Sequence, residues 1–112
     1  MIRSALIIDD ELDICILLSN YLKKRNIDAD YTLTLRDGLE KLSTVRPDVL
    51  FLDNNLPDGS GIDTIQEIRN RSENTRIIVI SAMSNLKEKA LASSADAFLD
   101  KPISFENIVE VL

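Results

Sequence analysis

Short apolar runs alternate with amphipathic stretches along the whole of this chain. Four of the runs occupy residues 6–8, 49–52, 77–80 and 97–99. Runs of this length, rich in branched side chains, are typical of strands that are buried on both faces of a parallel sheet. Residues 28–33 alternate polar and apolar side chains, which predicts one further strand.

Apolar side chains at helical spacing fill the intervals between these strands. They predict helices over residues 12–25, 34–42, 62–68, 86–93 and 105–112. The segment 86–93 is the weakest of them, because it has few large apolar side chains. We expect it to be only marginally packed, and marginally packed elements are the ones that move most easily.

Several polar residues stand where these helices begin or end. Asn26 follows the first helix, at a position that is often left-handed, a conformation that asparagine tolerates. Thr34, with Asp37 three residues later, resembles a capping box, and Ser104 is the expected N-cap of the last helix. That helix is expected to direct four apolar side chains toward the core: Phe105, Ile108, Val109 and Leu112.

The strict alternation of strands and helices predicts an α/β fold, a flavodoxin-like doubly wound (βα)5 domain over residues 1–112. Right-handed crossovers then place helices on both faces of a five-stranded parallel sheet. The second strand ends in Thr32-Leu33-Thr34, whereas the other four end next to carboxylate, hydroxyl or ammonium groups. The strand order 2-1-3-4-5 makes those four ends contiguous. The last helix is short, so we expect either a frayed terminus or an output domain outside this chain.

The polar residues at the four strand ends form a chemically consistent set. Asp9 and Asp10 follow the first strand, Asp53 follows the third, Ser81 the fourth and Lys101 the fifth. Carboxyl ends of parallel strands meet at one edge, where ligands bind in open α/β sheets. Two carboxylates about 5 Å apart repel each other by about 3 kcal/mol at an effective dielectric of about 20, which favours a bound cation. The set would hold a divalent cation and a phosphoryl group together.

Composition narrows the chemistry further. The net charge of −6 argues against direct binding to nucleic acid or an anionic membrane, and no apolar stretch approaches the length of a membrane span. A cytoplasmic location is expected. The chain has no histidine, so it has no Ser-His-Asp set, and any metal must be held by oxygen ligands, which favours Mg²⁺ or Mn²⁺. Cys15, the single cysteine, is expected to be a packed thiol.

Taken in order, these residues resemble the receiver domain of two-component response regulators, and the resemblance covers essentially the whole chain. It rests on the following positions: Asp9-Asp10-Glu11, Asp53, Leu56-Pro57, Gly61, Ser81-Ala82, Phe98 and Lys101-Pro102. The resemblance implies a phosphorylation-activated signalling switch rather than a metabolic enzyme. Such a domain catalyses its own phosphorylation and dephosphorylation.

The resemblance also implies a magnesium site. Asp10 and Asp53 would be direct ligands of Mg²⁺, together with the backbone carbonyl of Asn55. Asp9 would lie just outside the direct ligands. Mn²⁺ could replace Mg²⁺, because both ions prefer oxygen ligands.

Roles in phosphoryl transfer follow from the same resemblance. Asp53 would accept the phosphoryl group as an aspartyl phosphate. Lys101 would pair with the phosphoryl oxygens, and the Ser81 hydroxyl would bind them once they are present. Ser81 and Phe98 together would form the switch, with Phe98 acting by packing because it lacks the hydroxyl of the tyrosine that is frequent at this position.

The partners implied are a sensor histidine kinase or a histidine phosphotransfer protein, since the chain has no histidine of its own. A homodimer through the last two helices and the fifth strand is also compatible with the resemblance. Ser94 replaces the usual glycine before the fifth strand, and it would be strained if that position has a positive φ.

Two other classes of function share part of this pattern. A phosphatase of the haloacid dehalogenase type also uses an aspartate nucleophile and a lysine, but it needs a second acid two residues later, where this chain has Asn55. A degenerate receiver that binds partners without being phosphorylated is the remaining alternative. The complete set of site residues disfavours it relative to the phosphorylated switch.

Overall fold

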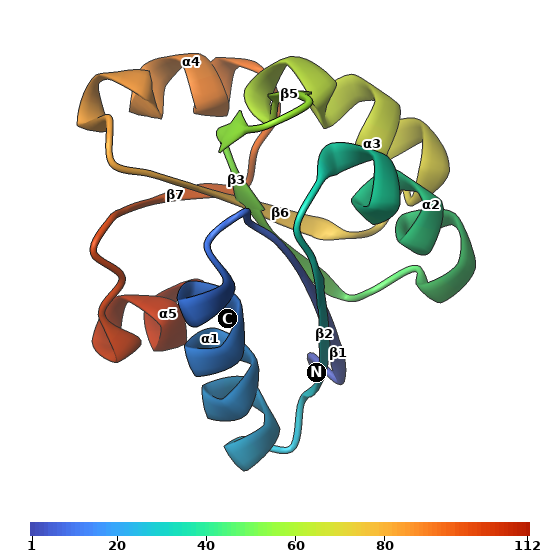
Figure 1. The fold of residues 1–112 in the computed structure, drawn as a ribbon, viewed down its shortest axis with the longest axis vertical. Coiled ribbons are helices and arrows are strands. Elements are labelled where there is room, and N and C mark those ends of the chain that lie inside the picture. Colours follow the sequence, from blue (N-terminus) through green and yellow to red (C-terminus); the bar gives the residue numbers. More distant parts are fainter.

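The computed structural model describes residues 1–112, and its centre is a five-stranded parallel sheet (Figure 1). The strands are β1 (Ser4–Ile8), β2 (Asp28–Thr32), β3 (Val49–Asp53), β6 (Arg76–Ser81) and β7 (Ala97–Asp100). Their order across the sheet is β2-β1-β3-β6-β7. Counted along the chain, this is the predicted order 2-1-3-4-5, and the predicted fold class is confirmed.

Five helices cover the sheet in two layers (Figure 1). They are α1 (Leu12–Lys24), α2 (Leu35–Val45), α3 (Ile65–Arg71), α4 (Lys87–Ala92) and α5 (Phe105–Val111). The helices α1 and α5 lie on one face, and α2, α3 and α4 lie on the other. Short 3-10 turns at Ile62–Thr64 and Ser84–Leu86 precede α3 and α4. None of the helices combines the length and the apolar character that crossing a membrane requires.

The core consists of two apolar layers separated by the sheet. Side chains alternate between the faces of a strand, so Phe51 packs toward α1 and α5, while Leu50 and Leu52 pack toward α2, α3 and α4. All five residues of β3 are buried. Burying one such side chain contributes roughly 1.5–3 kcal/mol, so the central strands hold the carboxyl edge of the sheet rigidly in place.

Most of the predicted helix ends are found. Asn26 has a φ of +64°, and Thr34 and Ser104 cap their helices by accepting hydrogen bonds from the N–H groups three residues later, both at 3.2 Å. Ser94 has a φ of +77°. A side chain at such a φ is disfavoured relative to glycine, so the strain expected at this position is present.

The expected core face of α5 is wrong in part. Ile108 is buried, but Phe105 and Val109 are 41% and 40% exposed. Only one row of side chains on this two-turn helix faces the sheet, and Phe105 and Val109 lie on its flank. Phe105 instead stacks on Tyr21 of α1, with ring centroids 4.2 Å apart and an interplanar angle of 7°.

Candidate functional site

Acidic side chains gather at the carboxyl edge of the sheet. Asp9 follows β1, and Asp53 is the last residue of the neighbouring strand β3. One carboxylate oxygen from each of Asp9, Asp10 and Asp53 lies within 4.8 Å of the others. Asp9 and Asp53 are buried, whereas Asp10 is exposed. The structure thus brings together three carboxylates that are up to 44 residues apart in the chain.

Lys101 is the single cation among these carboxylates. Its Nζ lies 2.9 Å from Oε1 of Glu11, 3.0 Å from Oδ2 of Asp9 and 3.5 Å from Oδ1 of Asp53. The backbone N–H of Lys101 donates a 2.9 Å hydrogen bond to the carbonyl of Ser81, which connects the residue after β7 to the end of β6. Lys101 is therefore held over the site by its backbone as well as by its charge.

Burial and charge shift the pKa values in this cluster. Burial, assisted by the negative charge of Asp9, raises the pKa of Asp53 to about 6, even though Lys101 opposes the shift. Burial also raises the pKa of Asp9. Burial alone would lower the pKa of Lys101, but its contacts with Glu11, Asp9 and Asp53 outweigh that effect and raise it. The site carries excess negative charge that one ammonium group does not balance.

A divalent cation fits this arrangement. Oδ2 of Asp9 is buried and has no hydrogen bond, although it lies near the Lys101 ammonium group. Oδ1 of Asp9 accepts a 2.8 Å hydrogen bond from the N–H of Glu11. All the side-chain atoms available as metal ligands are carboxylate oxygens, which suit Mg²⁺ rather than zinc or copper.

The segment after Asp53 forms a tight hairpin. It contains β4 (Asn55–Leu56) and β5 (Gly59–Ser60), and Asn54 braces it by accepting a 2.8 Å hydrogen bond from the Ser60 hydroxyl. Asp58 caps α2 by accepting hydrogen bonds from the N–H groups of its first two residues, both at 2.9 Å. A Cβ atom on Gly61 would lie 2.3 Å from the carbonyl oxygen of Asp53, so glycine is required there.

The two predicted switch residues lie beside this site on neighbouring strands. Ser81, the last residue of β6, is buried, and its hydroxyl accepts a 3.0 Å hydrogen bond from the N–H of Met83. Phe98 on β7 is half-buried and packs against the apolar layer that includes Ala90 of α4. A change at Ser81 could therefore reach α4 through the turn at Met83 or through Phe98.

Sequence reasoning missed the roles of Glu11 and Asp58. Glu11 belongs to the acidic run Asp9-Asp10-Glu11, but its pairing with Lys101 depends on a contact across 90 residues.

The prediction for Cys15 is confirmed. Its thiol is buried, its Sγ donates a hydrogen bond to the carbonyl of Asp9, and burial raises its pKa to about 12.

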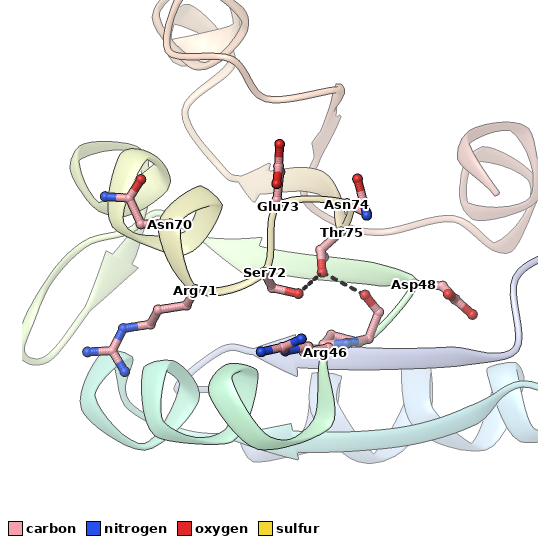
Figure 2. Close-up of a pocket in the computed structure, with 9 residues that line it drawn as sticks. Arg46, Asp48, Asn70, Arg71, Ser72, Glu73, Asn74 and Thr75 are labelled. Atoms are coloured by element: carbon pink, nitrogen blue, oxygen red, sulfur yellow. Dashed lines mark hydrogen bonds between the residues drawn. The ribbon is translucent and has the colours of Figure 1, made fainter.

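A polar cavity of about 380 Å³ opens at the opposite, amino edge of the sheet (Figure 2). Its buried hydroxyl groups already have partners within the protein. The Thr75 hydroxyl donates to the carbonyl of Pro47 at 2.6 Å, so the Ser72 hydroxyl must be the donor in its 2.5 Å hydrogen bond to Thr75. No buried polar group is left to bind a ligand, and this cavity is not the functional site.

Comparison with known proteins gives one consistent family. The family model described as response regulator receiver domain matches residues 5–112. The chain is 34% identical to the response regulator protein PilR of Pseudomonas aeruginosa and 31% identical to the chemotaxis protein CheY of Thermotoga maritima, in both cases over 98% of the chain. It spans 25% of PilR but 94% of that CheY protein.

Solved structures agree with this assignment. A two-component response regulator from Clostridium difficile is 27% identical and superposes with a TM-score of 0.90, covering 96% of this chain and 90% of that one. A response regulator from Burkholderia pseudomallei, solved with a phosphorylated aspartic acid and a calcium ion, has the same fold, with a TM-score of 0.91. It is 22% identical, and the match covers 98% of this chain and 66% of that one.

Proposed function

This chain belongs to the receiver domain family of two-component response regulators, and on that basis we propose that Asp53 is its phosphorylation site. Receiver domains are signalling domains rather than metabolic enzymes. One observation carries the assignment of Asp53. It is a buried carboxylate at the end of the central strand β3, beside a lysine and two further acids. A carboxylate placed in this way can act as a nucleophile toward phosphorus.

The transfer would proceed by attack of a carboxylate oxygen of Asp53 on the phosphorus of a phosphohistidine. A P–O bond forms and the P–N bond breaks, and the imidazole leaves with that electron pair and with the proton already on its other nitrogen. The pKa of about 6 leaves Asp53 mostly ionised at neutral pH. Lys101 stays within reach of the new phosphoryl oxygens.

Asp10, Asp53 and the backbone carbonyl of Asn55 would hold the magnesium ion, with Asp9 beside them. A Mg²⁺ ion in this position supplies positive charge that offsets the charge of the phosphoryl oxygens. The three clustered carboxylates and the buried oxygen of Asp9 that lacks a hydrogen bond support this proposal.

Phosphorylation would be read out through Ser81 and Phe98. The Ser81 hydroxyl, which now accepts from Met83, would turn to the phosphoryl group, and the turn between β6 and α4 would follow. Phe98 is half-buried and packs against the apolar layer that includes Ala90 of α4, so it can pack into the space that this movement opens. The short helix α4 and the strand β7 are the elements expected to shift.

The phosphodonor would be a sensor histidine kinase or a histidine phosphotransfer protein in the cytoplasm. An apolar groove between α1 and α5 opens next to the residues that follow Asp10 and Lys101. It is lined by Ile14, Leu17, Leu18, Pro102, Ile103, Phe105 and Ile108. The apolar lining of this groove would pack against apolar side chains of the donor protein, which would bring its phosphohistidine toward Asp53. A homodimer through α4, β7 and α5 stays a prediction.

The test is phosphorylation by a small acyl phosphate in the presence of Mg²⁺. The wild type should gain one phosphoryl group, labile to base and to hydroxylamine, and Asp53→Asn should gain none. Amide exchange with a phosphoryl mimic should change at residues 82–93 and 97–105, and Ser81→Ala should lose most of that change. Modification of Asp53→Asn at the wild-type rate would overturn the assignment, and no modification of the wild type would favour a degenerate receiver.

A further inference from the structure

The carboxylate of Glu11 neither caps a helix nor belongs to the candidate metal site. It is the N-cap residue of α1, yet its side chain accepts no hydrogen bond from the first turn of the helix. It is also absent from the cluster of carboxylates that could hold a metal ion. Its side chain is 58% exposed, so solvent alone could satisfy it. The structure instead directs it to Lys101.

The pair with Glu11 is the best-formed contact of Lys101. The 2.9 Å contact with Oε1 of Glu11 is the only hydrogen bond of the ammonium group, whereas its approaches to Asp9 and Asp53 are ion pairs without hydrogen-bond geometry. The backbone of Glu11 is fixed, because its N–H donates to Asp9 and its carbonyl accepts from the N–H of Cys15. The Glu11 side chain can therefore release Lys101 without moving α1.

We propose that Glu11 is a positioning residue that holds the Lys101 ammonium group in the unphosphorylated domain and releases it when Asp53 is phosphorylated. The inference rests on the proposed function and adds a competitor for Lys101 within the site. A phosphoryl group offers three strong acceptors and close to two negative charges, so it attracts the ammonium group more strongly than an exposed carboxylate does. Glu11 regains full hydration on release, since more than half of its side chain already faces solvent.

Competition of this kind weakens phosphoryl binding by the strength of the pair that must be broken. Exposed ion pairs contribute modestly to stability, which corresponds to a change in affinity of about two- to fivefold. Glu11→Gln should therefore raise the affinity for beryllofluoride, measured at saturating Mg²⁺, by about two- to fivefold. The matched control is Asp13→Asn, which removes one negative charge from the first turn of α1 at an exposed position with no contact to Lys101.

A second measurement separates this role from a merely structural one. In urea unfolding without metal, Glu11→Gln should be more destabilising in the wild-type background than in a Lys101→Ala background, because the partner is then missing. Loss of a structural contact would lower the stability and the affinity for beryllofluoride together. The inference requires Glu11→Gln to lower the stability and to raise the affinity for beryllofluoride. Both changes are measured after subtraction of the general charge effect, which Asp13→Asn provides.

The outcomes distinguish this inference from the proposed function. If the wild type is phosphorylated on Asp53 but Glu11→Gln binds beryllofluoride no more tightly than Asp13→Asn, the role of Glu11 is wrong and the proposed function stands. The same conclusion holds if the Glu11→Gln effect on unfolding is equal in the two backgrounds. If the wild type neither accepts phosphate nor binds beryllofluoride, the proposed function fails, and the role of Glu11 fails with it.

Discussion

The polar groups at the two edges of the sheet differ in how fully they are paired. At the amino edge, Thr75 and Ser72 satisfy each other and the carbonyl of Pro47 (Figure 2). Asp96 there accepts a 2.7 Å hydrogen bond from the N–H of Ile77 and pairs with Arg69 at 2.8 Å. At the carboxyl edge, the Lys101 ammonium group lies among the carboxylates of Asp9, Glu11 and Asp53, and one buried oxygen of Asp9 has no hydrogen bond.

Two aspartates show what this difference means. Burial raises the pKa of Asp53 to about 6, with a further contribution from the charge of Asp9. Burial also acts to raise the pKa of Asp96, but the Ile77 N–H and Arg69 outweigh it, so this pKa lies below its ordinary value. The amino edge stabilises the fold, whereas the carboxyl edge stores an unfavourable charge arrangement that a cation or a phosphoryl-bound state can relieve.

The pH dependence of stability should divide the two edges most clearly. The pKa of Asp53 is raised in the folded state, so its proton stabilises the fold below about pH 4. In the absence of metal, the free energy of unfolding should fall by about 3 kcal/mol as the pH rises from there through 6. Asp96 has the opposite sign, so its contribution is present above its unfolded pKa and is lost as the pH falls through its lowered folded pKa. Urea unfolding in EDTA from pH 3 to 8 measures both.

Single substitutions assign these two pH-dependent changes to their residues. Asp53→Asn should reduce the loss of stability between pH 4 and 6 and leave the loss of stability at acid pH intact. Asp96→Asn should reduce the loss of stability at acid pH, lower the stability at neutral pH and leave the change between pH 4 and 6 as it is in the wild type. An unchanged slope between pH 4 and 6 in Asp53→Asn would contradict the charge arrangement described for the carboxyl edge.

The hydroxyl network of the amino edge is the next test. Thr75→Val keeps the shape of the side chain but leaves the Pro47 carbonyl and the Ser72 hydroxyl without their partner. It should lower the free energy of unfolding by about 2 kcal/mol. Thr75→Ser is the control, because it keeps the hydroxyl, and it should lose much less. Equal losses in chemical denaturation would show that packing of the methyl group, and not the network, stabilises this edge.

The smallest expected effect concerns magnesium at the carboxyl edge. At a Mg²⁺ concentration ten times the dissociation constant, the wild type should gain about 1.4 kcal/mol of stability. Asp10→Asn should lose this increment, and its metal-free form should be more stable than the wild type because one repulsive charge is gone. Asp13→Asn, an exposed acid outside the cluster, should keep the increment. Thermal unfolding with and without Mg²⁺ would detect an equal response in Asp10→Asn, which would remove the proposed site.

The sequence predicted the parts of this molecule that depend on local pattern. Apolar runs and helical spacing identified the sheet strands and the helices. The contrast between Thr34 and the reactive strand ends gave the strand order. Short-range rules also predicted the conformations of Asn26 and Ser104. These inferences succeed because periodicity, caps and strand ends are properties of neighbouring residues.

Only the tertiary structure decided which polar groups meet and which remain unbalanced. The pairing of Lys101 with Glu11 spans 90 residues, and the exposed position of Phe105 depends on how α5 packs against α1. The buried oxygen of Asp9 without a hydrogen bond likewise depends on how three strand ends and one lysine side chain are placed together. Sequence position brings such groups to one edge of the sheet, but side-chain reach and burial determine their partners. The chain alone therefore specified the fold and the chemistry available at its carboxyl edge, whereas the balance of charge there arises from three-dimensional packing.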